Sequence, residues 1–206
     1  MHSGTALATR SAASLDMQLP TATQSSALVR RLVEAGISSI LYLRGLFDER
    51  CYTEESVGGL TVKHLKKKSS ADTHSRTATD AKATRQLDQA ATIASWIESA
   101  CGEPISKKYL RSLTVGISVT PHTPWLIVEC YTFHIRYSGS TATAAKTGPP
   151  AAHSRSEVKA ITQQLLRRLL VLTQSLPPLP SGRVLSMKLS YYPHTPADYE
   201  PPQFCA

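Results

Sequence analysis

A chain of 206 residues that is 41% hydrophobic can bury one core and gives no sign of a second. Its formal net charge of +8 favours acidic partners such as nucleic acid, acidic protein surfaces or anionic lipid. The sequence has neither the apolar run of a secretory signal nor the roughly 18 uninterrupted apolar residues of a membrane span, so we expect neither a secreted nor a membrane protein.

The four cysteines are scattered along the chain, with no C-x-x-C pair and no histidine at zinc-ligand spacing. They are Cys51, Cys101, Cys130 and Cys205. Scattered thiols indicate a reducing compartment, and we expect neither a metal nor another cofactor.

The first helix is expected after a polar tail. Residues 1–24 are rich in Ser, Thr and Ala, which predicts a disordered tail ahead of one domain over residues 25–206. Ser25 and Ser26 can cap a helix that ends at Gly45. Apolar residues cover most of its circumference, which is typical of a buried helix.

Turn-forming residues and a short strand follow this helix. Residues 47–59 have turn chemistry, and residues 59–65 predict a strand. Charged and small polar residues then predict a disordered loop over residues 66–86. A basic cluster here is a candidate for phosphate contacts or a nuclear address: Lys63, Lys66, Lys67 and Lys68. No aromatic residue is interleaved to stack a base, so a solvated loop is favoured.

A second helix and a hairpin are predicted next. Over residues 86–101 apolar residues recur at spacings of three and four, and Gly102 follows. Residues 113–120 and 125–137 alternate in polarity and are joined by a Pro-His-Thr-Pro turn, which predicts an antiparallel hairpin.

The stretch 125–137 is interpreted as a long strand of the sheet core. Alternation places Ile127, Tyr131 and Phe133 on the core face, with residues 135 and 137. Its first half is apolar on both faces, so we expect that half to be covered on both sides. Glu129 is interpreted as a hydrogen-bonded or edge-facing carboxylate with a structural role, because no second carboxylate or histidine lies at a useful catalytic spacing.

The C-terminal third begins with a low-complexity loop over residues 138–153, which we expect to be disordered. Ser154 and Glu157 then form a capping box ahead of a third helix. Its apolar stripe is Val158, Ile161, Leu165, Leu169, Leu172 and Leu176. Prolines end this helix, and residues 184–192 alternate as a final strand before a proline-rich remainder that should run extended over the surface.

The sequence contains few arrangements of residues that could support catalysis. The chain has no H-E-x-x-H, no phosphate-binding or dinucleotide-binding glycine loop and no G-x-S-x-G. Cys51 and His64 could act as nucleophile and base, but no orienting partner is identifiable, and a buried thiol and a surface imidazole explain them better. His122 and His194 each lie in an H-T-P turn. These observations favour a non-enzymatic binding module.

Five stretches resemble the HORMA domain, and its meiotic chromosome-axis branch in particular. They are LRGLFDERCY from Leu43, GLTVKHL from Gly59, KKYLRSLTVGI from Lys107, VECYTFHIRY from Val128, and LPPLPSGRVLSMKLSYYPHTPADYEPPQF from Leu176. The last is the most specific, because a Tyr-Tyr pair followed by TPxDYxPPxF is shared by the meiotic members.

The resemblance implies an α+β fold in which a small antiparallel sheet of about three strands is backed by three helices. In this family a C-terminal safety belt closes over a short closure-motif peptide, which adds as a strand to an edge of the sheet. The edge would be formed by Val184, Leu185, Ser186, Met187, Lys188, Leu189, Ser190, Tyr191 and Tyr192. The belt would begin with Tyr199, Pro201, Pro202 and Phe204.

The resemblance also implies a function, namely a peptide-capturing adaptor of the meiotic chromosome axis that supports homologue pairing, synapsis and recombination on chromosomes in the nucleus. The expected partners are a closure-motif peptide from an axis protein or another copy of the chain, and an AAA+ ATPase remodeller. The chain stops at Ala206, where family members continue into the belt, so we expect most of the belt to be missing.

Two alternatives stay open. One is a basic nucleic-acid-binding module that uses the lysine cluster. The other is a HORMA adaptor of the checkpoint or translesion-polymerase branch, against which the string TPADYEPP argues.

Overall fold

The structure is a computed structural model that describes residues 21–67, 81–119, 126–137, 155–180 and 182–204. In chain order its elements are α2 (Ala22–Leu43), the 3-10 turn η1 (Glu49–Cys51), β1 (Tyr52–Val57), β2 (Leu60–Leu65), α3 (Ala81–Cys101), α4 (Glu103–Ser106), β3 (Leu110–Ser118), β4 (Ile127–His134), α5 (Arg155–Gln174) and β5 (Val184–Tyr191). Three long helices with antiparallel sheets confirm the predicted α+β class.

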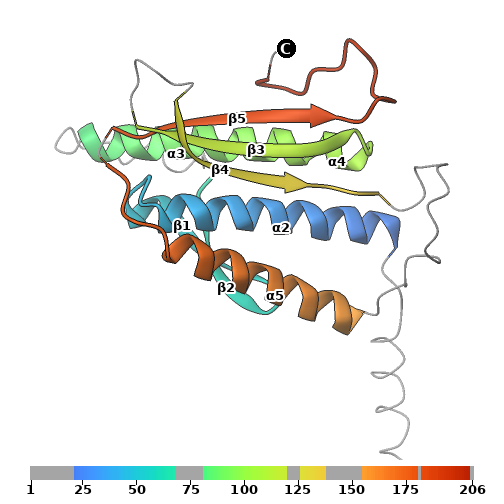
Figure 1. The fold of residues 1–206 in the computed structure, drawn as a ribbon, viewed down its shortest axis with the longest axis horizontal. Coiled ribbons are helices and arrows are strands. Elements are labelled where there is room, and N and C mark those ends of the chain that lie inside the picture. The colour runs from blue at the N-terminus through green and yellow to red at the C-terminus, as the bar shows by residue number, and fades with distance from the viewer. Residues whose placement is uncertain (1–20, 68–80, 120–125, 138–154, 181, 205–206) are drawn as a thin grey trace, which may run out of the picture.

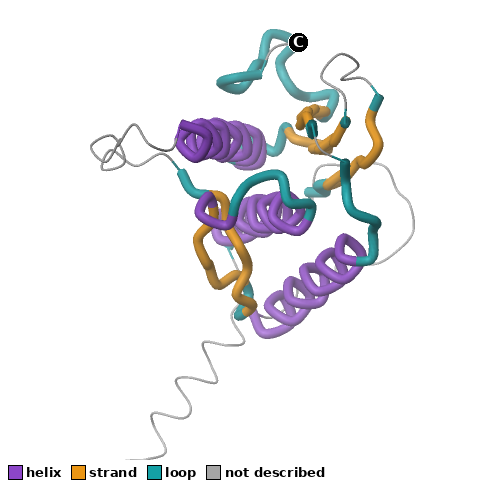
Figure 2. The backbone as a smooth tube through the Cα atoms, turned by 90° about the vertical axis from the view of Figure 1, so that its left-hand side faces the viewer, coloured by secondary structure: helices purple, strands orange, loops and turns teal. Residues whose placement is uncertain are grey.

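Helix α2 lies at the centre of the domain (Figure 1). The sheet β4-β3-β5 and α3 lie on one side of it, and α5 with the β1-β2 hairpin lies on the other; Figure 2, which looks along the helices, shows α2 between α3 and α5. The packing is close at Gly36, where a Cβ atom would lie 3.1 Å from Phe133 of β4 and 3.3 Å from Leu169 of α5. Residues 33–41 are all buried, which confirms the buried helix.

The first helix begins earlier than predicted. Thr21 is its N-cap: the Thr21 hydroxyl accepts a hydrogen bond from the Gln24 amide, and the Gln24 side chain accepts one from the Thr21 amide. Ser25 and Ser26 therefore lie inside the helix, so the predicted cap is wrong, and the helix begins three residues before the predicted start of the domain at residue 25. The C-terminal boundary was correct, because Gly45 adopts the left-handed φ of +61° just after the last turn.

The hairpin β1-β2 replaces part of the predicted turn region. Gly58 and Gly59, with φ of +61° and +86°, form the two-residue connection, and the register runs from Tyr52 opposite Leu65 to Val57 opposite Leu60. Strand β1 was missed because its exposed face carries acidic and hydroxyl residues. The Gly-Gly pair between two alternating segments was the signal that could have revealed it.

Helix α3 begins at Ala81, five positions before the predicted residue 86, so residues 81–86 are not part of a loop. Residues 68–80 of that predicted loop lie outside the described residues. The apolar stripe predicted for this helix is confirmed at Ala90, Ala94, Ile97 and Cys101, which are buried, but not at Leu87, which is 39% exposed. The short helix α4 was not predicted.

The hairpin of β3 and β4 is confirmed, but β4 is not a central strand. Strand β3 lies between β4 and β5, so β4 forms an edge of the sheet within the part of the chain that the structure describes. The first half of the predicted strand is not covered on both faces: Leu126, just before β4, and Ile127 and Val128 in it are 59%, 45% and 48% exposed. A strand that is apolar on both faces can equally be an exposed edge, which periodicity does not distinguish.

A β-bulge changes the face of Ile127. Ile117 pairs with Glu129, whereas Ser118 pairs with Ile127, so one residue of β4 is skipped. The Ile127 side chain comes to lie over Gly116, 3.0 Å from where a Cβ atom would be, and not on the core face as predicted. Beyond the bulge the prediction holds, since Tyr131, Phe133 and Ile135 belong to the core.

Helix α5 exists as predicted but buries a different stripe. Leu166, Thr162 and Thr173 are buried, while Ile161, Leu165 and Leu172 of the predicted stripe are 48%, 53% and 67% exposed. The Thr173 hydroxyl donates to the Leu169 carbonyl, which satisfies it inside the core. Ser154, half of the predicted capping box, lies outside the described residues, as do residues 138–153.

Candidate functional site

Strand β5 is the second edge of the three-stranded sheet. Among the described strands it pairs only with β3, antiparallel, from Leu110 opposite Tyr191 to Ser118 opposite Val184. An edge strand presents a row of backbone N–H and C=O groups to whatever lies beside it. The final strand was predicted over residues 184–192, and its place at an edge of the sheet was implied by the family resemblance.

The direction of these backbone groups can be assigned. In an antiparallel pair, alternate residues exchange hydrogen bonds with the partner strand and the others point away. The Tyr192 amide donates to the Tyr109 carbonyl at 2.8 Å, so Lys188 and the other even-numbered residues of β5 face β3. The pairing of β3 with β4 agrees once the register shift between Leu110 and Ser112 is included: the Arg111 carbonyl accepts from the Ile135 amide beside β4, so beyond the shift the even-numbered residues of β3 face β5. The outward groups of β5 therefore belong to its odd-numbered residues.

The same alternation fixes the side chains of β5. The residues with outward backbone groups pack their side chains against the core: Leu185, Met187, Leu189 and Tyr191. Ser186, Lys188 and Ser190 are exposed on the other face of the sheet. The free edge is thus formed by residues whose side chains are already held in place.

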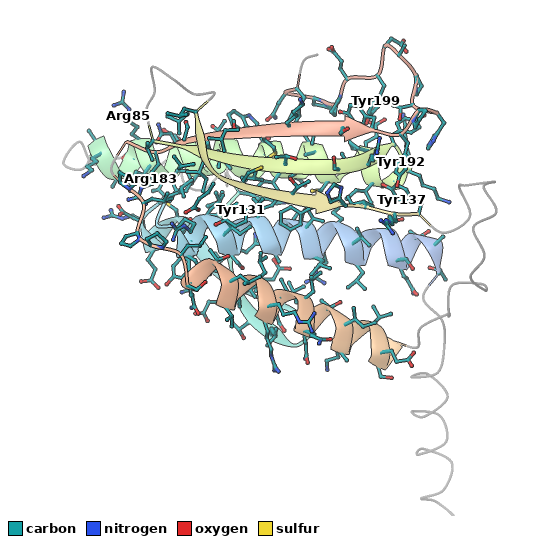
Figure 3. The ribbon with its side chains drawn as sticks, viewed as in Figure 1. Arg85, Tyr131, Tyr137, Arg183, Tyr192 and Tyr199 are labelled. Atoms are coloured by element: carbon teal, nitrogen blue, oxygen red, sulfur yellow. The ribbon has the colours of Figure 1, made fainter. Side chains whose placement is uncertain are left out.

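A hollow of about 890 Å³ lies where β5 begins, between β5 and α3. We call it the α3–β5 hollow. Its apolar lining is Leu46, Phe47, Ile93, Trp96, Val184 and Leu185, and its charged lining is Arg85, Asp88 and Arg183. Figure 3 shows Arg85 and Arg183 at the same end of the molecule, away from Tyr192 and Tyr199. No sequence signal pointed to this hollow, because its residues come from three distant segments.

Arg183 fixes the start of β5. Its Nη1 donates to the carbonyl of Arg44 at 2.6 Å and also to the carbonyl of Gly45. These carbonyls end helix α2, so the guanidinium caps that helix and lies at the favourable end of its dipole. The first residue of the edge is therefore placed relative to α2.

Aromatic rings cover the other end of the edge. Tyr199 makes edge-on contacts with Tyr109, at 4.9 Å between centroids, and with Tyr191, at 5.7 Å. The Lys107 ammonium lies 5.5 Å from the centre of the Tyr199 ring. The Tyr192 hydroxyl donates to the Ile135 carbonyl at 2.7 Å, which ties the end of β5 to the segment after β4.

The segment after β5 folds back over α3. It contains successive turns, in which Thr195 donates to Tyr192 and Tyr199 donates to Pro196, so it is not simply extended as predicted. The Gln203 side chain donates to the Ser95 hydroxyl of α3 at 2.7 Å. Three of the four predicted belt-start residues pack against the domain. Tyr199 contacts the neighbouring tyrosine rings, Pro201 is buried, and Phe204 packs on the core, whereas Pro202 is exposed.

The predicted lysine cluster is not one patch. Lys63 pairs with Glu49 at 3.0 Å and Glu54 at 3.3 Å, and the hydrogen bond to Glu49 is the main reason why the Lys63 pKa is raised. Lys67 pairs with Glu98 at 2.9 Å and lowers the pKa of that carboxyl. Lys66 is exposed, and Lys68 lies outside the described residues.

A second hollow, of about 860 Å³, is lined by two of these lysines, Lys66 and Lys67, together with other cationic side chains. We call it the basic hollow. Its cationic lining is Arg30, Arg31, Lys66, Lys67 and Lys108, with His64, and its acidic lining is Glu34 and Glu55. Arg30 and Arg31 are already paired with these two acids, at 2.9 and 2.6 Å. An excess of positive charge nevertheless remains around the hollow.

Cys51 and His64 do not have the character of a catalytic pair. Burial is the main cause of a raised Cys51 pKa, which disfavours the nucleophilic thiolate. One His64 nitrogen lies 3.2 Å from the Leu65 carbonyl, and the other lies 3.8 Å from Glu55.

Within the described ranges, no group of three or more metal-ligating side chains is close enough together to hold a metal ion. None of the described helices has the length and apolarity needed to cross a membrane.

Comparison with known proteins places these features in a family. The family model described as HORMA domain matches residues 25–206. HORMA domain-containing protein 1 from Xenopus laevis is 34% identical over 193 residues, covering 92% of this chain and 46% of the relative. The protein of that name from Rattus norvegicus is 32% identical over 199 residues, covering 91% and 45%. The chain thus spans about half the length of these curated relatives.

A solved structure has the same fold. The structure of C. elegans HTP-2 bound to HTP-3 closure motif 1 matches with a TM-score of 0.69 and 14% identity, covering 91% of this chain and 74% of that chain.

Proposed function

Because the chain belongs to the HORMA-domain family, we propose that it is a non-enzymatic adaptor that captures a closure-motif peptide along the outer edge of β5. The observation that carries the proposal is the edge itself: in the described part of the chain no strand pairs with it, and its outward backbone groups belong to Leu185, Met187 and Leu189. The solved HTP-2 structure supports it, because that protein is bound to a closure motif.

The energetics favour a second element that retains the peptide. Each added backbone hydrogen bond is worth a net ~0.5 to 1.5 kcal/mol, so the few outward groups of β5 give a modest affinity. A belt that begins at Tyr199 and closes over the peptide would slow its release by trapping it. The contacts of residues 193–204 support this role, because they anchor the base of such a belt on the rings of Tyr109 and Tyr191 and on Ser95 of α3.

The partners we propose are a closure-motif peptide of a meiotic axis protein or of another copy of this chain, and an AAA+ ATPase that releases it. The adaptor would act on chromosomes in the nucleus, where it would support homologue pairing, synapsis and recombination. The likeness to HORMA domain-containing protein 1 supports this placement.

The test is peptide capture with a backbone readout. Short peptides tiled across meiotic axis proteins and across this chain are incubated with the immobilised protein and washed extensively. A retained peptide is then resynthesised with single N-methylated amides. We expect methylation at alternate positions to abolish retention, because only alternate amides of an added strand face β5. Absence of any retained peptide, or equal retention of every methylated form, would contradict edge capture.

A substitution in β5 gives the reciprocal test. Met187→Pro removes an outward N–H and leaves the hydrogen bonds to β3 in place, whereas Lys188→Pro would break the pairing with β3. Met187→Ala is the matched control for the lost side chain. We expect Met187→Pro to reduce peptide retention well below that of Met187→Ala.

The basic hollow supports a second candidate function, nucleic-acid binding. Five cationic side chains and two acidic ones surround it. This candidate predicts DNA affinity that falls steeply with salt and with Lys66→Ala and Lys108→Ala, but not with Lys63→Ala, because Lys63 is already paired with two glutamates. Binding that is absent or insensitive to salt would exclude it.

A further inference from the structure

The α3–β5 hollow lies beside the first residues of the free edge. Val184 and Leu185 of β5 line it together with Ile93 and Trp96 of α3. Ile93 is 9% exposed, and Trp96 and Leu185 are half-buried, so the lining is an open part of the core surface. A strand added to β5 would cross the mouth of this hollow.

The register of an added strand decides which of its side chains faces the hollow. Residues directly opposite each other in neighbouring strands project to the same face of the sheet. Leu185 projects toward the core, so the peptide residue opposite Leu185 projects toward α3 and into the hollow. The residue opposite Lys188, three positions away, projects to the solvent-exposed face beside an exposed ammonium.

Contacts within the chain show which kinds of side chain pack between α3 and the three-stranded sheet. Phe204 packs its ring on the core, and Gln203 is held by Ser95, the neighbour in α3 of Trp96, which lines the hollow. Tyr199 covers Tyr191 at the last position of the strand. The chain's own aromatic side chains therefore cover the sheet edge at Tyr191, whereas the hollow beside Leu185 is open. This difference singles out the peptide residue opposite Leu185.

We propose that the α3–β5 hollow is a side-chain pocket that selects the captured peptide, which carries a large apolar residue opposite Leu185 and an acidic residue opposite Lys188, three positions apart. The apolar residue gains affinity by burial against Ile93 and Trp96. The acidic residue forms a cross-strand pair with Lys188 on the exposed face, which contributes less. This inference rests on the proposed capture of a peptide by β5.

The experiment uses a library of fluorescein-labelled peptides in which two positions three apart are varied, with Ala, Leu or Phe at one and Ala, Glu or Lys at the other, in both orders. Affinities are measured by fluorescence anisotropy. For the wild-type protein we expect replacement of the apolar residue by Ala to weaken binding about tenfold or more. Replacement of Glu by Lys should weaken it severalfold.

Three protein variants assign these effects. Gln89→Trp fills the hollow from an exposed position of α3, and Gln164→Trp makes the same change at an exposed position of α5, far from β5. We expect the preference for an apolar residue to disappear in Gln89→Trp and to remain in Gln164→Trp. Lys188→Glu should reverse the preference from Glu to Lys at the second position.

The outcomes separate the two proposals. If peptides bind but show no preference for an apolar residue, or if that preference survives in Gln89→Trp, the pocket is wrong while edge capture stands. If the wild-type protein binds no member of the library, edge capture itself is overturned together with the pocket. We expect both variants to fold, because Gln89 and Gln164 are exposed, and circular dichroism checks this.

Discussion

The guanidinium of Arg44 and the carboxylate of Glu129 join the end of α2 to the edge strand β4 through two hydrogen bonds, one of them 2.9 Å from Nε to Oε2. Arg44 is 5% exposed and Glu129 14%, so the pair is largely removed from water. The Tyr131 hydroxyl adds a third donor to Glu129 at 2.9 Å, and Arg44 also donates to the Pro177 carbonyl at 2.6 Å. The interpretation of Glu129 as a structural carboxylate is confirmed.

Removing one partner of this pair should be costly. Arg44→Met leaves a carboxylate in a largely buried site without its cation, and we expect a loss of about 3 to 5 kcal/mol in the free energy of unfolding. The double variant Arg44→Met with Glu129→Met removes both charges and should be more stable than Arg44→Met. Urea unfolding of the wild-type protein and of both variants measures this. A double variant that is less stable than Arg44→Met would contradict the account.

The hairpin turn predicts a second stability effect. Gly58 has a φ of +61°, and a Cβ atom there would lie 2.9 Å from the Thr162 methyl group. Gly58→Ala should therefore cost about 2 kcal/mol, from the left-handed conformation and from the contact. In a double-mutant cycle, Thr162→Ser should relieve part of the cost because it removes that methyl. Additive effects of the two substitutions would show that the contact contributes nothing.

Two tyrosines near the end of β5 form a matched pair. The Tyr192 hydroxyl donates to the Ile135 carbonyl at 2.7 Å, whereas the Tyr199 hydroxyl is buried with no hydrogen-bond partner among the described residues. Tyr192→Phe should cost about 1 kcal/mol, and Tyr199→Phe should be neutral or stabilising. Thermal unfolding compares the two, and equal losses would contradict the assignment.

Alkaline pH should destabilise the fold through its buried tyrosines. Burial, with smaller contributions from Tyr192 and Cys101, raises the pKa of Tyr137 from near 10 to about 12. The folded state holds this proton more tightly, so its contribution to stability is complete below pH ~10 and is lost as the pH rises to about 12. Burial also raises the pKa values of Tyr52 and Tyr131.

The substitution Tyr137→Phe tests this origin. It should make the fall of unfolding free energy above pH ~10 shallower without abolishing it, because the other tyrosines still titrate. Urea unfolding at a series of alkaline pH values measures the slope. An unchanged slope would show that Tyr137 is not protected in the folded state.

Sequence reasoning predicted the elements better than their surroundings. The type of each long helix and the hairpin of β3 and β4 followed from periodicity, and the family followed from the string that ends at Phe204. The start of α2 was wrong because two successive serines offered a plausible cap and the true cap, Thr21, lay inside a polar tail. The start of α3 was wrong because its first turn contains only alanine, lysine and threonine and therefore carries no large apolar residue to mark the helical period.

The contacts between elements were harder to predict from the sequence than the elements themselves. The apolar residues of α5 form more than one stripe, and the sequence does not say which one meets α2, so Ile161 and Leu165 of the predicted stripe are largely exposed. The position of β4 at an edge depends on where β5 inserts, which is a long-range relation. The α3–β5 hollow could not be predicted, since Phe47, Trp96 and Leu185 come together only in the folded chain.

The inward side chains of β5 bear on how such a site could evolve. Its outward-facing chemistry is main chain, supplied by Leu185, Met187 and Leu189, and the exposed side chains of Ser186 and Ser190 are not needed to form that edge. Substitutions at those two serines would leave the backbone pattern intact, so this part of the surface is free to drift. A peptide partner that binds through its main chain can likewise accept substitutions at most of its own positions and still bind. The adaptor and its ligand could then diverge together in sequence.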